Sequence, residues 1–303
     1  MTVKVSKPAI NVREELADLK KPTGIAGEAM LRAGTARDQF NLIGAGRKNL
    51  IINGAMNVAQ RGTSSSSIAD ASAYRTVDRW KGSVWSGTYT ISQSTDSPPG
   101  FGASTKFDCT TAESPGAGDS LMFYQNIEGQ NLQSVCKGTS SAKPLACSFW
   151  VKSTVTGTAI AELYDIDNNR GVSGTYTILS SNTWEYKTII FPPDMTGAFD
   201  NNNAASMYLA FWLVAGSNYT SGTLATNWAT STDANRVAGQ TINIGSSTSN
   251  DFYITGIQLE AETICTSFEH RSYGEELALC QRYFWKSNST HYCQQYQPSY
   301  RMV

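Results

Sequence analysis

Several short motifs in the sequence contain residue types that could do chemistry. Gly118-Asp119-Ser120-Leu121 has the letters of a hydrolase motif in which the serine is the nucleophile and a downstream Asp-x-x-His supplies its base and orienting acid. The chain has two histidines, and Ser267 and Asn288 stand where the aspartate of each motif would be required. We therefore expect no esterase here, and we expect this motif to be a turn that enters a strand at residues 120–124.

A second motif has the spacing of calcium ligands. Asp165, Asp167 and Asn169 alternate as the oxygen ligands of a tight calcium loop do. The sixth position of such a loop is a glycine, here Arg170, and the twelfth is acidic, here Tyr176. A hairpin turn is the better interpretation, and no metal or other cofactor is predicted. Acidic residues elsewhere show no distinctive pair, which leaves a two-carboxylate glycosidase neither supported nor excluded.

Aromatic side chains remain as candidates for ligand binding. Rings exposed on a β-sandwich stack on the apolar faces of sugars, while nearby Asn, Asp and Gln side chains bond the sugar hydroxyls. Trp150, Trp184 and Trp212 lie in strand patterns, which predicts positions in the core. The predicted glycan contacts lie in stretches rich in Ser, Thr, Gly and Asn, and they are Trp85, Tyr219 and Trp228.

The composition restricts the elements that position these residues. The chain has 303 residues with a formal net charge of -1, which argues against a nucleic-acid binder. Charged residues make up 16%, below the roughly 25% of an average domain, and Ser, Thr, Asn and Gly replace them, a composition that favours strands and turns.

The sequence predicts neither membrane insertion nor export. The longest apolar run, residues 207–216, is shorter than the ~20 residues that span a bilayer, and no secretory signal is visible at the N-terminus. Without export, the six cysteines are expected to be reduced thiols.

From residue 49 onward the hydrophobic pattern has a period of two, which is typical of strands. Cys147, Phe149 and Val151 alternate with polar and aromatic neighbours, and residues 184–191 and 252–257 behave similarly. Residues 207–214 are apolar on both faces, which predicts a strand in the middle of a sheet. Residues 49–272 are therefore predicted to form an antiparallel jelly-roll β-sandwich.

The two ends of the chain have different patterns. Charged residues are about twice as dense in residues 1–48 as in residues 49–272, and short helical segments there carry single apolar stripes that they cannot bury alone. We expect a helical or extended arm that orders on another protein, with a partly disordered tail as the alternative. Residues 273–303 are predicted to be a short helix, with Leu277 and Cys280 on one face, followed by a tail. The predicted docking residues of the arm are Val12, Leu16, Leu19, Met30, Leu31 and Phe40.

Segments spread over the sandwich and the C-terminal helix form an ordered set. They are residues 49–62 (NLIINGAMNVAQRG), 78–80 (DRW), 125–129 (QNIEG), 148–153 (SFWVKS), 252–260 (FYITGIQLE) and 266–284 (TSFEHRSYGEELALCQRYF). This set resembles the jelly-roll module of tail fibres and other appendage proteins of tailed bacteriophages, especially phages of marine bacteria and cyanobacteria. The arm also resembles the N-termini of such proteins.

The resemblance implies a structural protein of the virion that assembles as a homotrimer and has no catalytic residues. It also implies a turn at Asn53-Gly54 and a packed polar cluster at Asp78, Arg79 and Trp80. The predicted function is a tail fibre or similar appendage, built in the bacterial host cytoplasm, that docks to other virion proteins and projects its sandwich toward host surface glycan. The alternatives are a polysaccharide depolymerase, a free carbohydrate-binding module and a capsid fibre or decoration protein.

Overall fold

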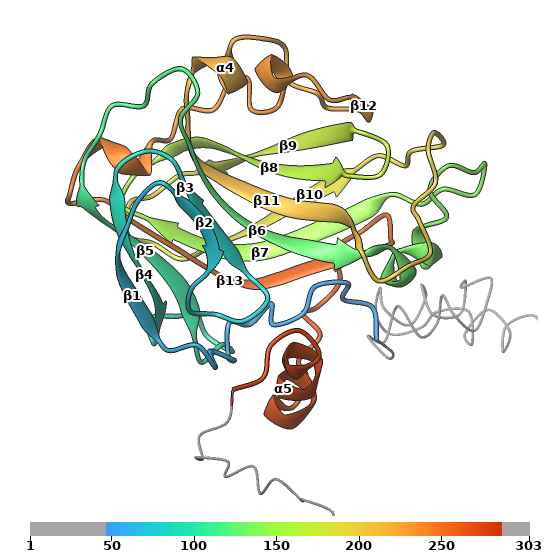
Figure 1. Cartoon of the computed structure of the whole chain (residues 1–303), viewed down its shortest axis with the longest axis horizontal. Coiled ribbons are helices and arrows are strands. Elements are labelled where there is room, and N and C mark those ends of the chain that lie inside the picture. The colour runs from blue at the N-terminus through green and yellow to red at the C-terminus, as the bar shows by residue number, and fades with distance from the viewer. Residues whose placement is uncertain (1–46, 287–303) are drawn as a thin grey trace, which may run out of the picture. The chain divides into compact units, whose positions relative to one another are not determined.

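Two β-sheets stacked face to face form the body of the chain (Figure 1). The computed structural model describes residues 47–286. The chain divides into two units, Met1–Lys48 and Asn49–Val303, and both sheets belong to the second unit. Six predicted docking residues lie outside the described part of the chain, namely Val12, Leu16, Leu19, Met30, Leu31 and Phe40.

Both sheets are antiparallel. The six-stranded sheet has the order β1-β4-β5-β13-β7-β10, and its strands are β1 (Ser64–Ile68), β4 (Thr88–Ser94), β5 (Ser104–Thr111), β13 (Asp251–Glu260), β7 (Leu145–Ser153) and β10 (Glu185–Phe191). The seven-stranded sheet has the order β12-β9-β8-β11-β6-β3-β2, and its strands are β12 (Ala229–Thr230), β9 (Arg170–Ile178), β8 (Gly157–Asp165), β11 (Ala205–Ala215), β6 (Ser120–Glu128), β3 (Lys81–Val84) and β2 (Ala71–Tyr74).

The helices within residues 47–286 are short. The α-helices of this part of the chain are α4 (Ser217–Thr220) and α5 (Tyr273–Gln281), and its 3-10 helices are η1 (Gly129–Asn131), η2 (Gln133–Val135), η3 (Asp233–Asn235) and η4 (Ile244–Ser246). Helix α5 begins with a capping box in which Ser272 and Glu275 bond each other's backbone N–H. The predicted jelly-roll β-sandwich with a short C-terminal helix is confirmed. No helix within residues 47–286 is long and apolar enough to cross a membrane.

The core lies between the two sheets, where aromatic rings from opposite layers meet edge to face. Phe107 of β5 contacts Phe123 of β6 at 5.4 Å between ring centroids, and Phe149 of β7 contacts Phe211 of β11 at 4.8 Å. Such ring pairs stabilise a core by about 0.5–1.5 kcal/mol beyond the burial of their area. The predicted central strand is confirmed, because β11 lies in the middle of its sheet and both Phe211 and Trp212 are fully buried on its two faces.

Two of the three predicted core tryptophans lie elsewhere. Trp212 is buried, but Trp150 and Trp184 are half-buried on the outer face of the six-stranded sheet. The inner face of β7 is formed by Phe149 and its alternate neighbours, which leaves Trp150 pointing outward. A two-residue period separates the faces of a strand without telling which one is inward, and this is why the prediction was wrong for Trp150.

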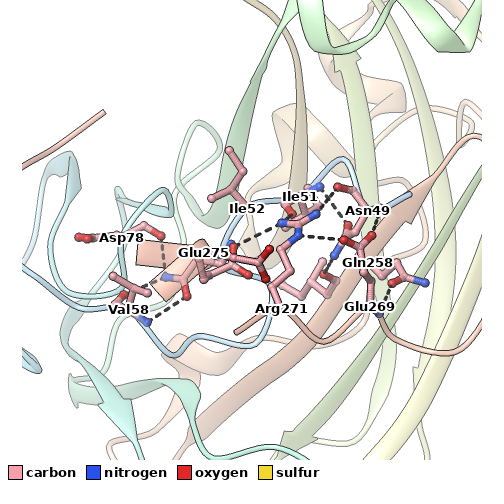
Figure 2. A network of polar contacts seen from close by, with 12 residues as sticks. Asn49, Ile51, Ile52, Val58, Asp78, Gln258, Glu269, Arg271 and Glu275 are labelled. Carbon is pink, nitrogen blue, oxygen red and sulfur yellow. Dashed lines mark hydrogen bonds and ion pairs between the residues drawn. The ribbon is translucent and has the colours of Figure 1, made fainter. Parts of the chain in front are cut away.

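The first and last segments of the body are tied together by a polar network around Arg271 (Figure 2). Its guanidinium donates to the backbone carbonyls of Asn49 at 2.8 Å and Ile51 at 3.1 Å, and it pairs with Glu269 at 3.0 Å and Glu276 at 3.4 Å. The Arg271 side chain is 7% exposed. The network therefore fixes α5 and the segment before it against the first residues of the sandwich.

The turn implied at Asn53-Gly54 is confirmed and belongs to the same region. Asn53 has a φ of 59° and its side chain bonds the backbone of Val58 and Asp78. A Cβ on Gly54 would lie 2.1 Å from the carbonyl oxygen of Ile257, so only glycine fits there. Asp78, Arg79 and Trp80 are all buried, as the resemblance implied.

The motif of Gly118 to Leu121 is a turn that leads into β6, as predicted. Ser120 is the buried first residue of that strand. His270 packs its ring against Phe101 and Phe268, at 5.3 and 4.9 Å between centroids, and His291 lies outside the described residues. Ser120 thus has the structural role expected from the sequence.

The calcium-like motif is the hairpin between β8 and β9, as predicted, with Asp165 paired to Arg170 in the ladder. Asp165 is fully buried and binds the ammonium of Lys137 at 2.5 Å. The same ammonium lies 3.1 Å from Asp194 and donates to the backbone carbonyls of Thr196 and Gly197. Asp165 therefore belongs to a buried cluster of ion pairs, in which the ammonium of Lys137 takes the place that a metal ion would have.

Five cysteines lie in the described residues and all are free thiols: Cys109, Cys136, Cys147, Cys265 and Cys280. Burial raises the pKa of the Cys265 thiol to about 11. The free thiols agree with the reduced state predicted for these five residues.

Candidate functional site

A line of four tyrosines and one lysine crosses the outer face of the seven-stranded sheet. It consists of Tyr74 on β2, Lys81 on β3, Tyr124 on β6, Tyr208 on β11 and Tyr164 on β8, and we call these five residues the aromatic row. Tyr74 is opposite Lys81, Lys81 is opposite Tyr124, and Tyr208 is opposite Tyr164 in the strand register. At a strand spacing of about 4.8 Å, five adjacent strands carry the row over about 19 Å.

Strand alternation places the row on the outside. Phe123, Leu209 and Leu163 point into the core and are buried, so their neighbours Tyr124, Tyr208 and Tyr164 point away from it. Each of these three tyrosines is half-buried. The row therefore lies half-buried on the outer face of the sheet, where Tyr124 and Tyr208 also pack against a small apolar cluster around Trp212.

Neighbouring members of the row touch one another. The ammonium of Lys81 lies 5.4 Å from the ring centroid of Tyr74 and 5.5 Å from that of Tyr124. The Tyr124 and Tyr208 centroids are 5.5 Å apart, and Tyr208 stacks on Tyr164 at 5.0 Å with an interplanar angle of 11°. The rings stand as an ordered series that presents apolar edges and polar hydroxyls together.

The tyrosine hydroxyls are held in place by polar partners. Tyr164 donates to Asn169 at 2.7 Å, and Tyr124 and Ser72 share a hydrogen bond of 3.1 Å. Tyr208 accepts a 2.6 Å bond from Arg236. Burial and the nearby Glu162 carboxylate raise the pKa of Tyr208 well above its usual 10.0, so its phenol stays neutral. These bonds fix the ring orientations before any ligand binds.

Arg236 and Glu162 support the β8 end of the row. The guanidinium makes a two-pronged pair with the Glu162 carboxylate at 2.8 and 2.9 Å, and Trp212 donates its indole N–H to the same carboxylate at 3.0 Å. Burial would lower the pKa of Arg236, but the pairing with Glu162 raises it above its usual range. Glu162 is buried and fully engaged, which makes it a support for the row and not a free acid or base.

The β2 end of the row borders a small hollow of about 130 Å³. Arg61 and Arg79 line this hollow, and their guanidiniums lie 3.6 and 3.5 Å from the ring centroids of Phe284 and Tyr283. Arg61 also lies 5.3 Å from the ring of Tyr74. The hollow and the row thus form one continuous series of cations and rings.

The three predicted glycan contacts do not come together in one place. Trp85 is 44% exposed and follows β3, and its indole N–H donates to Ser83, whose side chain shares a face with Lys81. Tyr219 packs on Trp212 at 5.1 Å between centroids, beside the row. Trp228 is half-buried against the core, and its indole N–H donates to the carbonyl of Pro192. Trp85 and Tyr219 therefore flank the row, whereas Trp228 belongs to another part of the molecule.

Sequence reasoning missed the tyrosines of the row. Tyr124 and Tyr208 lie in segments that were predicted to be strands, but the row exists only because β6, β11 and β8 are neighbours in the sheet. The available signal was the alternation of Tyr208 and Trp212 with apolar residues in β11. Because that strand is apolar on both faces, the alternation did not distinguish its outer face from its inner one.

The opposite sheet also carries aromatic residues on its outer face. Tyr186 is 46% exposed and contacts Trp150 at 5.4 Å between centroids. Lys152 lies between the rings of Tyr253 and Trp184, at 4.3 and 5.7 Å, and pairs with Asp96. This face serves as the comparison surface for tests of the row.

No protein-family model and no curated protein matches this chain. Solved structures with partial similarity include the enzymatically active domain of tailspike protein 4 of bacteriophage CBA120, at 15% identity and a TM-score of 0.34 over 64% of this chain and 21% of that one. A family 11 carbohydrate-binding module from Clostridium thermocellum, in complex with a mixed-linked tetrasaccharide, matches at 15% identity and a TM-score of 0.32 over 67% of this chain and 99% of that one. A CBM4 structure matches at 8% identity and a TM-score of 0.34, over 69% and 98%.

The similarity to the tailspike covers about a fifth of that protein's length. All three TM-scores lie below 0.5, so the architecture rests on the strand pairing of the two sheets. Within residues 47–286, no group of three or more His, Cys, Asp or Glu side chains is arranged to hold a metal ion.

Proposed function

We propose that this protein binds carbohydrate through the aromatic row. The observation that carries the proposal is a pre-ordered series of tyrosines on the outer face of a rigid sheet, with hydroxyl and amide groups beside them. Aromatic rings supply apolar contact to sugar C–H faces, and polar neighbours supply orientation and specificity. Asn126, directly opposite Tyr208 on β6, provides an amide at the centre of the row.

We further propose that the protein is a structural component of a bacteriophage particle, a tail fibre or similar appendage that assembles as a homotrimer. The ordered sequence set that resembles appendage proteins supports this assignment, as does the charged N-terminal arm. The arm would dock to other virion proteins and the sandwich would contact host surface glycan. Placement on the capsid is the alternative within the same class.

The proposed activity is binding and not cleavage. The carboxylates nearest the row are already engaged, Glu162 by Arg236 and Trp212 and Asp78 by Arg61 and Gln60. A glycoside hydrolase of the usual kind needs one carboxyl group free to protonate the leaving oxygen and a second to act as base or nucleophile. A reducing-end assay on every bound polysaccharide tests this part, and released ends would favour a depolymerase.

The binding proposal is tested by removing rings from one face at a time. The full-length protein is screened on a glycan array, and the strongest ligand is then titrated by calorimetry. Tyr124→Ala and Tyr164→Ala are each expected to weaken binding by about 1 kcal/mol, the usual value of one ring contact. Tyr186→Ala removes a more exposed ring from the opposite sheet and is the matched control. Loss of binding in the control alone would assign the ligand to the other face.

The virion proposal is tested by immunogold labelling of purified particles with an antibody to residues 49–272. Gold at the tail supports host adsorption, and gold over the head supports a capsid fibre. A chain lacking residues 1–48 is expected to stay out of particles. Absence of gold from all particles, or incorporation of the shortened chain, would contradict the docking role.

A further inference from the structure

Lys81 differs from the other cations that touch the aromatic row. Arg236 is paired with Glu162, and Arg61 is paired with Asp78 at 2.9 Å. Within residues 47–286, Lys81 makes no ion pair with any carboxylate. Lys81 is half-buried, and its ammonium lies 5.4 and 5.5 Å from the ring centroids of Tyr74 and Tyr124. The row therefore holds an uncompensated positive charge at a position fixed by two aromatic neighbours.

The surroundings of Lys81 extend this positive character. The ring of Tyr74 lies near two cations, with the Lys81 ammonium at 5.4 Å and the Arg61 guanidinium at 5.3 Å from its centroid. Arg79, which lines the adjoining hollow, is 6% exposed, and its Nε has no hydrogen-bond partner among the described residues. Lys81 thus lies near two guanidinium groups, which add to the positive potential at this end of the row.

We propose that the row recognises an anionic glycan, whose carboxylate or sulfate group pairs with Lys81 beside Tyr74. This inference rests on the proposed carbohydrate-binding function and names its ligand class. Adjacent sugar rings lie along Tyr124, Tyr208 and Tyr164. The anionic group replaces water around a constrained ammonium, so charge pairing adds to the ring contacts and selects against neutral chains.

The test compares three polymers with the full-length protein in calorimetry: neutral dextran, dextran sulfate and polygalacturonate. Dextran sulfate presents sulfate and polygalacturonate presents carboxylate, so the pair separates the two sources of charge. At least one polyanion is expected to bind at least tenfold more tightly than dextran. Because hydrogen bonds to charged groups commonly change affinity by about tenfold or more, Lys81→Gln is expected to remove about that factor, and Lys81→Arg to retain most of the affinity.

Lys106→Gln is the matched control. Lys106 also lies on a central strand beside a tyrosine, Tyr253, but on the opposite sheet, where it pairs with Asp251 at 3.0 Å. Because this charge is already compensated, Lys106→Gln is expected to leave polyanion affinity unchanged. Equal losses in Lys106→Gln and Lys81→Gln would show diffuse attraction to the whole surface and overturn the inference. Binding to neither polyanion, or dextran binding as tight as theirs, would also overturn it.

Failure of this inference is distinguishable from failure of the proposed function. If Tyr164→Ala weakens binding of the array ligand and Lys81→Gln does not, the row binds glycan but charge does not select it. If neither Tyr124→Ala nor Tyr164→Ala affects any ligand, the row itself is not the binding face. The melting temperature of every variant is measured as a control. A value within a few degrees of the parent excludes unfolding as the cause of lost binding.

Discussion

Replacing Arg271 with alanine is expected to loosen the tie between the two ends of the sandwich body (Figure 2). The side chain bridges the backbone of Asn49 and Ile51 to the carboxylates of Glu269 and Glu276. Arg271→Ala removes every one of these donors at once. Two carboxylates with side-chain exposures of 11% and 10% then lose their buried cation.

The size of the effect follows from burial. Breaking a buried pair by removing one partner costs about 3–5 kcal/mol, because the remaining charge stays desolvated. Arg282 provides the contrast, since it pairs with Glu128 at 2.7 Å but its side chain is 50% exposed. Exposed pairs contribute about 0–1 kcal/mol. Arg271→Ala should therefore cost several times more than Arg282→Ala, although each change deletes one arginine near the C-terminal helix.

The assay is urea unfolding of the full-length chain, followed by tryptophan fluorescence. A loss of about 3–5 kcal/mol corresponds to a fall in melting temperature of roughly 10 °C for a body of this size. Arg271→Lys keeps the charge but loses the forked geometry, and it should fall between the parent and the alanine variant. Losses that agree within 1 kcal/mol for Arg271→Ala and Arg282→Ala would refute the claim that burial makes this network strong.

Three further outcomes are expected. Lys137→Met should lower the free energy of unfolding by about 3–5 kcal/mol, because Asp165 would stay buried without its ammonium, whereas Asp194 keeps its pair with Arg170; an unchanged urea midpoint would contradict this. Burial alone would raise the pKa of Asp194, but hydrogen bonds from Arg170 and Lys137 hold it below its usual 3.8, so its stabilisation is complete above about pH 4 and disappears on acidification. Asp194→Asn should flatten the dependence of the urea midpoint on pH below about pH 4, and a profile parallel to that of the parent would contradict this. The rate of alkylation of Cys265, measured by peptide mass spectrometry, should be low at pH 8 and should keep rising as the pH approaches the thiol pKa of about 11. A rate that levels off by pH 9 would contradict this pKa.

The sequence was sufficient for elements with a clear local period. The strand at residues 207–214 is β11, and the helix over residues 273–282 is α5. Local chemistry also identified the hairpin at Asp165, because the glycine and closing acid of a calcium loop were missing. Each of these features depends on residues near one another in the chain.

The aromatic row could not be predicted in the same way. Tyr124, Tyr164 and Tyr208 belong to strands far apart in sequence, and they meet because β11 pairs with both β6 and β8. Periodicity gives the faces of each strand but not the order of strands in a sheet. The ion pair of Arg236 and Glu162, which supports the row, depends equally on a long-range contact. Trp85 and Tyr219 were chosen for their polar neighbours in sequence, and they flank the row without belonging to it.

The dimensions of the row also bear on how tightly one copy can bind. Three ring contacts at about 1 kcal/mol each, with a paired anion that adds a factor of about ten, give about 4 kcal/mol, which is close to the 4.1 kcal/mol of a millimolar Kd. Several linked copies multiply such an affinity by about 10²–10⁴ without any new contact. Weak single sites therefore suit an appendage that presents many copies to a surface. The same argument predicts that immobilised, dense glycan retains the assembled protein far longer than the affinity for a short soluble oligosaccharide implies, and equal retention at sparse and dense coating would contradict it.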